Sequence, residues 1–142
     1  MKLEHFPLRH NLRVRYSEID AQGVVFNAHY LTYFDTTINE AFRGSGIDWL
    51  AEVERSGCDV QLVRSLVEYK APLHFDEAFT VGAGVSRLGR SSLTWALGVF
   101  GADGSLRATG EIVWVYADLA AKRSTPLPDW LRQRAEALPL RS

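Results

Sequence analysis

Three things are scarce in this chain of 142 residues, and each scarcity excludes a class of protein. The single cysteine, Cys58, excludes an internal disulfide and fits a reducing compartment, so we interpret it as a packed thiol. Neither charge is in excess, since 16 basic residues face 17 acidic ones, and no general attraction to nucleic acid or membrane follows. No apolar run reaches the roughly eighteen residues of a membrane span, and residues 1–11 lack the apolar core of a signal peptide. We therefore expect a cytoplasmic protein.

The composition that remains is typical of a globular protein. Hydrophobic residues make up 46% and charged residues 23% of the chain, which is enough apolar material for a core. The length fits one domain over residues 1–142, and no internal repeat or low-complexity stretch divides it.

The first part of the chain predicts one strand and two helices. Residues 9–17 alternate between apolar and polar side chains, as a half-buried strand does. Two helices are predicted next, a long one and then a shorter one. The shorter helix has Asp48 as its N-cap residue and Gly57 at its end. The long helix, residues 28–43, can end at Gly44 and carries an apolar stripe at helical spacing: Leu31, Phe34, Ile38 and Phe42.

From residue 59 onward the apolar side chains alternate with a period of two, which predicts a series of long antiparallel strands. The alternation changes parity between Leu62 and Val67, so we expect a bulge near residues 63–66. Asp103-Gly104 is a strong hairpin signal, and Asp129 can cap a short C-terminal helix. One long helix among antiparallel strands is an α+β arrangement. Its long sheet has more apolar surface than one helix covers, so we expect a homo-oligomer.

The loop between the first strand and the long helix is the best candidate for a functional site. Asp20 lies seven residues before Asn27, which is a good N-cap residue for the helix. A carboxylate would thus lie close to free backbone N–H groups, which bind negative charge. The loop also contains three consecutive apolar residues, Val24, Val25 and Phe26, where loops are usually polar. Such residues suggest a lined pocket or a protein interface.

Each candidate also has an ordinary structural explanation, and these alternatives stay open. Asp20 and Gly23 are common in turns for conformational reasons alone. Glu18 and Asp35 are further carboxylates near the loop, for which structural or solvent-exposed roles are more common. The four histidines have no spacing typical of a metal site, and no serine lies in a nucleophile motif.

Residues 16–35 resemble the signature of the hotdog-fold acyl-CoA thioesterases, reading Tyr-Ser-Glu-Ile-Asp-Ala-Gln-Gly-Val-Val-Phe-Asn-Ala-His-Tyr-Leu-Thr-Tyr-Phe-Asp. They are most similar to the 4-hydroxybenzoyl-CoA thioesterase branch, which includes the Tol-Pal-associated bacterial enzymes. The resemblance continues through Tyr69-Lys70-Ala71-Pro72 and the turn at residues 87–92, and so covers most of the chain. It implies a hotdog fold, in which an antiparallel sheet wraps around one long helix.

The resemblance also implies roles for individual residues. Asp20 matches the catalytic carboxylate of that branch, and Asn27 matches the residue that opens the helix and polarises the thioester carbonyl with its backbone N–H. The family builds its sites at a dimer interface, so a homodimer or homotetramer is implied. Two positions depart from the family pattern, since many relatives have His at Asn27 and an Ala-Arg pair at Thr37-Ile38.

Thioester hydrolysis needs few groups, because the thiolate leaves without strong acid assistance. One carboxylate that attacks the carbonyl or activates water is sufficient when the oxyanion is stabilised. We therefore predict hydrolysis of acyl-CoA without metal or redox cofactor, with Asp20 as either nucleophile or general base. The residues predicted to bind the acyl group are Gly23, Val24, Val25, Phe26 and Tyr30.

The phosphates of coenzyme A require local positive charge. Arg87, Arg90 and Ser91 share a turn and are predicted to hold these phosphates, with Lys122 and Arg123 as the alternative cluster.

Three other functions remain open at the level of sequence. A non-catalytic acyl-CoA-binding hotdog module would keep the pocket without using Asp20. A hotdog dehydratase of 3-hydroxyacyl thioesters usually pairs an acid with a histidine, and Asn27 stands in place of that histidine here. A structural partner in a larger complex would use the apolar loop for docking.

Overall fold

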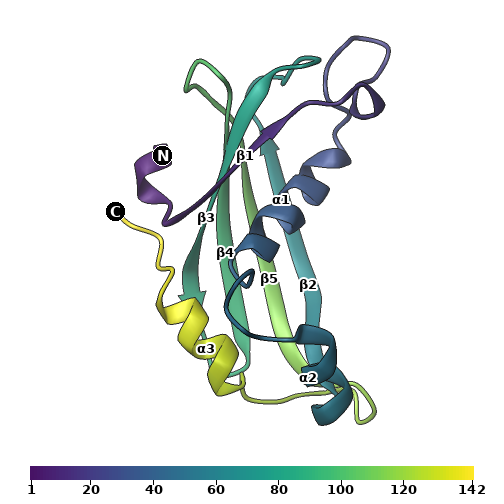
Figure 1. The fold of residues 1–142 in the computed structure, drawn as a ribbon, viewed down its shortest axis with the longest axis vertical. Helices are drawn as coiled ribbons and strands as arrows, with labels where there is room; N and C mark the ends of the chain where they lie inside the picture. The colour runs from purple at the N-terminus through teal and green to yellow at the C-terminus, as the bar shows by residue number, and fades with distance from the viewer.

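The computed structural model describes residues 1–142 and contains one antiparallel sheet, in which strands far apart in the sequence are neighbours (Figure 1). A short strand, β6 (Arg123–Ser124), pairs with the end of β5. The two edges of the main sheet are β1 and β2. The spatial order is β1-β3-β4-β5-β2, built from β1 (Leu8–Arg13), β2 (Cys58–Tyr69), β3 (Ala78–Leu88), β4 (Ser92–Phe100) and β5 (Leu106–Asp118).

Three α-helices accompany the sheet: α1 (His29–Glu40), α2 (Trp49–Ser56) and α3 (Asp129–Glu136). The longest, α1, lies across one face of the sheet and buries Phe34 and Ile38 against it (Figure 1). None of the three combines the length and the apolar character that a membrane-spanning segment requires. The predicted α+β fold, with an antiparallel sheet around one long helix, is confirmed.

The elements around the candidate loop begin and end differently from the prediction. β1 stops at Arg13, because residues Tyr16–Glu18 form a 3₁₀ turn whose Glu18 carboxylate accepts a hydrogen bond from the Arg15 N–H at 2.8 Å. The long helix ends at Glu40, and Gly44 lies beyond it in a left-handed conformation with φ 74°.

Other predicted signals have mixed outcomes. Asp48 caps α2 by accepting from the Ala51 N–H, and Gly57 follows that helix with φ 69°, as expected. The register of β2 against β5 shifts between Leu62 and Arg64, which confirms the predicted bulge. Asp129, in contrast, is the first residue of α3 and not its N-cap.

Glycines on β3 and β4 make room for the N-terminal segment on the sheet face opposite α1. Gly82 and Gly98 are paired across the two strands, and Phe6 lies over them fully buried. A Cβ on Gly82 would lie 2.6 Å from Phe6 Cγ, and one on Gly98 would lie 3.0 Å from its Cε2. On the α1 face, a Cβ on Gly110 would lie 2.3 Å from Phe34 Cε2. These glycines are therefore positions of close packing.

An aromatic cluster fills the sheet end farthest from the start of α1. The ring centroid of Phe42 lies 5.0 Å from that of Trp49, and the Trp95 and Trp114 centroids lie 5.7 Å apart. Offset and edge-to-face pairs of this kind contribute about 0.5–1.5 kcal/mol each beyond the area they bury. The members of this aromatic cluster are Phe42, Trp49, Trp95, Trp114 and Trp130.

The edge strand β2 presents apolar side chains to solvent. Leu62 is 60% exposed, Val63 57% and Tyr69 53%. One side of this strand pairs with β5, and the backbone groups of the other side have no strand partner. An apolar open edge of twelve residues is typical of a strand that pairs with another chain.

Candidate active site

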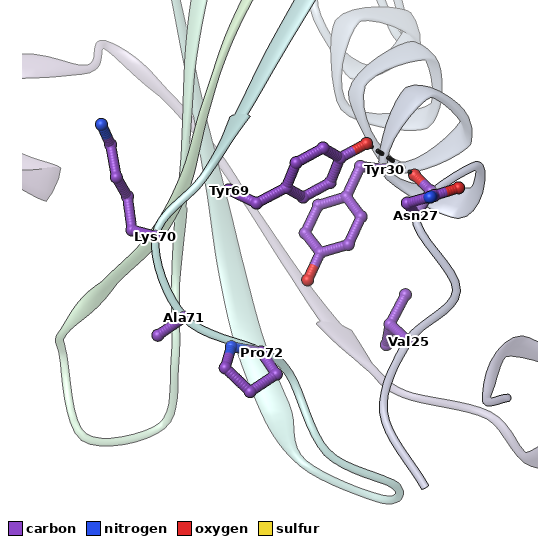
Figure 2. A pocket seen from close by; sticks show the side chains of 7 residues that line it. All are labelled: Val25, Asn27, Tyr30, Tyr69, Lys70, Ala71 and Pro72. Atoms are coloured by element: carbon purple, nitrogen blue, oxygen red, sulfur yellow. Dashed lines mark hydrogen bonds between the residues drawn. The ribbon is translucent and has the colours of Figure 1, made fainter. Parts of the chain in front are cut away.

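A cleft of about 290 Å³ opens between the start of α1 and the end of β2. Figure 2 shows the loop before α1 on one side, and the residues at the end of β2 on the other. The seven residues that line the cleft are Val25, Asn27, Tyr30, Tyr69, Lys70, Ala71 and Pro72.

Two tyrosines join the walls of the cleft. The Tyr69 hydroxyl donates to the Asn27 carbonyl at 3.2 Å, and its ring meets that of Tyr30 edge to face at 5.2 Å (Figure 2). Tyr30 is buried, and burial raises the pKa of its hydroxyl, so it stays protonated near neutral pH. The cleft therefore has an aromatic floor that includes the buried, protonated Tyr30 hydroxyl.

The start of α1 offers free hydrogen-bond donors beside the cleft. The N-cap residue is Ala28, and no side chain caps the helix, so the prediction that Asn27 is the N-cap is wrong by one residue. The N–H groups of Asn27 and Ala28 donate to no acceptor in the protein, whereas those of His29 and Tyr30 donate to Phe26 and Asn27 carbonyls. Uncapped donors at a helix N-terminus are a binding place for an anion.

Asp20 is exposed and lies on a turn that presents it without strain. Its carboxylate accepts from the Gln22 N–H at 2.8 Å, and its own N–H donates to the Val24 carbonyl at 2.9 Å. Gly23 closes the turn with φ 77°, a conformation that favours glycine. Asp20 belongs to the same loop as the cleft wall but does not line the cleft.

The predicted acyl-binding residues separate into two groups. Val25 and Tyr30 line the cleft. Gly23 and Val24 instead connect the loop to residues 73–75, since Val24 forms a β-bridge with His74. Phe26 is 48% exposed and packs edge to face on the His29 ring.

Glu18 has a structural role in the loop. Its side chain is 5% exposed and accepts hydrogen bonds from the Arg15 guanidinium at 2.8 Å and the Tyr33 hydroxyl at 2.8 Å. Burial raises the pKa of the Glu18 carboxyl, but these hydrogen bonds outweigh it and hold the pKa below its ordinary value. Burial and the Glu18 hydrogen bond together raise the pKa of Tyr33. Glu18 thus stays ionised and joins the loop to α1.

Asp35 lies elsewhere on α1, at a second, smaller cavity of about 120 Å³. This cavity is lined otherwise by apolar side chains, namely Leu31, Ile38, Leu62, Ile112 and Trp114.

The residues predicted to hold coenzyme A lie at the opposite end of the sheet from the cleft. Tyr69 pairs with Ala108 near one end of β5, whereas the Ser91 carbonyl accepts from the Tyr116 N–H near the other end. Positions 108 and 116 are eight strand residues apart, about 27 Å. Arg90 and Ser91 lie in the turn between β3 and β4, whereas Arg87 is still part of β3 and pairs with Thr94, so Arg87 does not share the turn as predicted.

The second wall of the cleft, Tyr69 to Pro72, has no predicted role in the sequence. The sequence signal for this wall is Pro72, three residues after the aromatic strand residue Tyr69. Proline cannot donate a backbone hydrogen bond to a neighbouring strand, so the strand ends and the chain turns away. Lys70 is the one cationic side chain of the cleft.

Comparisons with known proteins agree with this architecture. The model of the thioesterase-like superfamily matches residues 14–135. An Aquifex aeolicus protein designated an esterase is 33% identical over 97 residues, 68% of this chain and 75% of the relative. The acyl-CoA thioester hydrolase YbgC of Escherichia coli is 26% identical, over 82% of this chain and 87% of its own.

A solved structure extends the comparison to the fold. The thioesterase of Thermus thermophilus, crystallised with coenzyme A and zinc, is 32% identical with a TM-score of 0.79, covering 94% of this chain and 95% of its own. Since the superfamily model covers most of the chain, including the candidate loop and both walls of the cleft, this chain belongs to the thioesterase-like superfamily.

Proposed function

We propose that the protein is an acyl-CoA thioesterase that hydrolyses a thioester to a carboxylic acid and free coenzyme A. The observation that carries this proposal is the pair of free N–H groups at Asn27 and Ala28 beside the cleft, on the same loop as Asp20. Two relatives support the substrate class: YbgC is named an acyl-CoA thioester hydrolase, and the T. thermophilus thioesterase binds coenzyme A.

The proposed reaction assigns one task to each group. The thioester carbonyl oxygen accepts hydrogen bonds from the free N–H groups at the start of α1, which stabilise the negative charge of the tetrahedral intermediate. Asp20 attacks the carbonyl carbon or removes a proton from the attacking water. The C–S bond then breaks and the thiolate of coenzyme A leaves. When Asp20 itself attacks, water then hydrolyses the acyl–Asp20 anhydride, which releases the carboxylic acid and restores the Asp20 carboxylate. One such N–H donor is worth about 3 kcal/mol at a transition state.

A second copy of the chain completes this proposal. If β2 pairs antiparallel with the β2 of a partner about a two-fold axis, the start of the partner's strand lies beside Tyr69 and the cleft. The apolar exposure of Leu62 and Val63 on the open edge supports such pairing. The distant turn with Arg87 and Arg90 would then approach the cleft of the other subunit, where the phosphates of coenzyme A need positive charge.

The rival functions make different demands on the same site. A non-catalytic module needs the cleft but not an exposed carboxylate. A dehydratase of 3-hydroxyacyl thioesters would need an acid paired with a histidine, and none of the residues lining the cleft is a histidine.

The experiment that tests the proposal measures free thiol released from straight-chain and aromatic acyl-CoAs by the wild-type protein. Turnover of at least one of them is expected. Tight binding without release would favour the non-catalytic module, and hydration of 2-enoyl-CoA would favour the dehydratase.

A mixed oligomer tests whether the site is shared. Subunits with Asp20→Asn are combined with subunits carrying both Arg87→Ala and Arg90→Ala. At acyl-CoA concentrations below KM, a shared site predicts that the mixed oligomer regains the wild-type KM, because one of the two clefts then has its Asp20 and the partner's arginines intact. A monomer in solution with full turnover would contradict the shared site.

A further inference from the structure

Arg107 does not line the cleft, yet it contacts the segment that forms its second wall. We propose that Arg107 is a positioning residue of the active site, which fixes residues 70–77 and, through them, the loop that carries Asp20. This inference rests on the proposed thioesterase function.

The guanidinium of Arg107 is almost fully engaged within the protein. Its side chain is 10% exposed, at the start of β5. Nη1 donates to the Pro72 carbonyl at 2.7 Å, and Nε donates to Ser105 Oγ at 2.8 Å. Nη2 donates to Glu77 Oε2 at 2.8 Å and to Asp103 Oδ1 at 3.1 Å. A planar group with donors on three nitrogens joins separate segments in a way that the single ammonium of lysine cannot.

The backbone of Arg107 contacts the same wall. Its carbonyl accepts from the N–H groups of Lys70 at 2.8 Å and Ala71 at 3.1 Å. Together with the bond from Nη1 to Pro72, one residue thus fixes three consecutive residues that line the cleft.

Glu77 fixes the other end of the segment. Its carboxylate accepts from both terminal nitrogens of Arg107 and from the His74 N–H at 3.1 Å. Burial raises the pKa of Glu77, but the Arg107 hydrogen bonds outweigh it and keep the pKa below its ordinary value. The pair therefore remains charged at neutral pH, and charge-assisted bonds of this kind are both short and directional.

The segment transmits this arrangement to the loop of Asp20. The Val25 N–H donates to the Leu73 carbonyl at 2.9 Å, and the Phe75 N–H donates to the Gly23 carbonyl at 3.2 Å. Val25 lies three residues before Ala28, the N-cap of α1, and Gly23 closes the turn on which Asp20 lies. Both functional groups of the site therefore depend on where residues 72–75 are placed.

The test compares Arg107→Lys with Arg134→Lys. Arg134 is a matched control, because it is also a partly buried arginine that donates to a backbone carbonyl, that of Ala41. Arg107→Lys is expected to lower kcat about tenfold while KM changes less than about threefold, because misplaced groups lose transition-state contacts and not ground-state binding. Arg134→Lys is expected to change neither by more than about twofold.

A second pair of variants separates positioning from general stability. Glu77→Gln and Asp103→Asn each remove one charged partner of Arg107, but only Glu77 belongs to the segment that forms the wall. A loss of kcat in Glu77→Gln with none in Asp103→Asn is expected. Equal losses in both, or a wild-type kcat in Arg107→Lys, would overturn the proposal.

Amide hydrogen exchange measures, without substrate, how firmly the loop of Asp20 is held to residues 72–75. Faster exchange at Val25 is expected in Arg107→Lys and not in Arg134→Lys, because the Val25 bond to Leu73 loosens. Unchanged exchange would refute the role of Arg107. A wild-type protein that hydrolyses no acyl-CoA would refute the thioesterase function instead, so the two failures are distinguishable.

Discussion

The two ends of the sheet are held by different kinds of contact. Beside the cleft, two carboxylates accept short, charge-assisted bonds, the buried Glu18 from Arg15 and the partly buried Glu77 from Arg107. At the opposite end, the aromatic cluster is held mainly by ring packing around Phe42, with one hydrogen bond to a carboxylate, from Trp49 Nε1 to Asp59 at 2.9 Å.

The difference separates positioning from stability. Charged hydrogen bonds are directional, so they fix where individual atoms lie, although removing charges from water offsets much of their energy. Aromatic burial is far less directional, but it contributes strongly to the free energy of folding. Changes at the cleft end should therefore alter activity first, and changes in the aromatic cluster should alter stability first.

The largest expected effect is at Asp20. Asp20→Asn should lower kcat about a thousandfold, about 4 kcal/mol, because the amide can neither attack a carbonyl nor accept a proton. The unfolding midpoint in urea should change little, since the side chain is exposed. Both values can be measured on the same preparation. Asp35→Asn is the matched control, and retention of more than about a tenth of kcat in Asp20→Asn would move the role to Asp35 or Glu18.

The reverse pattern is expected in the aromatic cluster. Phe42→Ala should lower the free energy of unfolding by about 3 kcal/mol, because it removes a ring that contacts four tryptophans. Under conditions where the variant is folded, kcat should stay within about twofold. Chemical denaturation and thiol-release kinetics measure the two effects. A fall in kcat of more than about tenfold in the folded variant would contradict the separation of positioning at the cleft from stability in the aromatic cluster.

Glu18→Gln should lower both kcat and the free energy of unfolding, because Glu18 is buried and joins the loop of Asp20 to α1. A loss of about 2 kcal/mol of stability is expected at neutral pH. Since the folded pKa of Glu18 lies below its ordinary value, its contribution is complete above about pH 4.3 and is lost as the pH falls through the folded value. The difference between wild type and variant in urea denaturation should therefore shrink in acid. A difference independent of pH would show that charge is not the cause.

The smallest effect is expected at the turn of the distant end. Arg87→Ala and Arg90→Ala should each raise KM for acyl-CoA about threefold and leave kcat nearly unchanged, because phosphate contacts bind ground and transition states alike. Steady-state kinetics on the purified variants measures KM and kcat. Lys122→Ala and Arg123→Ala are the comparison, and an effect there but not at the arginines would move the phosphate site to the later loop.

The sequence was sufficient for elements with a regular pattern. The strands from β2 onward, the bulge near Leu62 and the caps of α2 follow from local periodicity and turn chemistry. The start of α1 was misplaced by one residue, because asparagine is a common N-cap but here Tyr69 from β2 bonds to the Asn27 carbonyl. That bond joins residues 42 apart in the sequence, which no local pattern reveals.

The candidate site divides along the same line. The first wall, formed by Val25, Asn27 and Tyr30, lies in a stretch that the sequence singles out, because its residues are close together in the chain and resemble a known signature. The second wall depends on Arg107 joining Pro72 and Glu77, contacts that only the folded sheet brings together. The turn at Arg90 can be predicted from the local sequence. Its distance from the cleft cannot, because it depends on the length and pairing of strand β5.

The slot that holds Phe6 has an evolutionary consequence. Any side chain at Gly82 or Gly98 would occupy the space of the ring, and a smaller residue at position 6 would leave a groove across the sheet. A substitution at one of these positions alone is therefore unfavourable, whereas a smaller residue at position 6 combined with larger residues at positions 82 and 98 is not. Among homologues, these three positions should vary together or not at all, although they are separated by 76 and 16 residues along the chain.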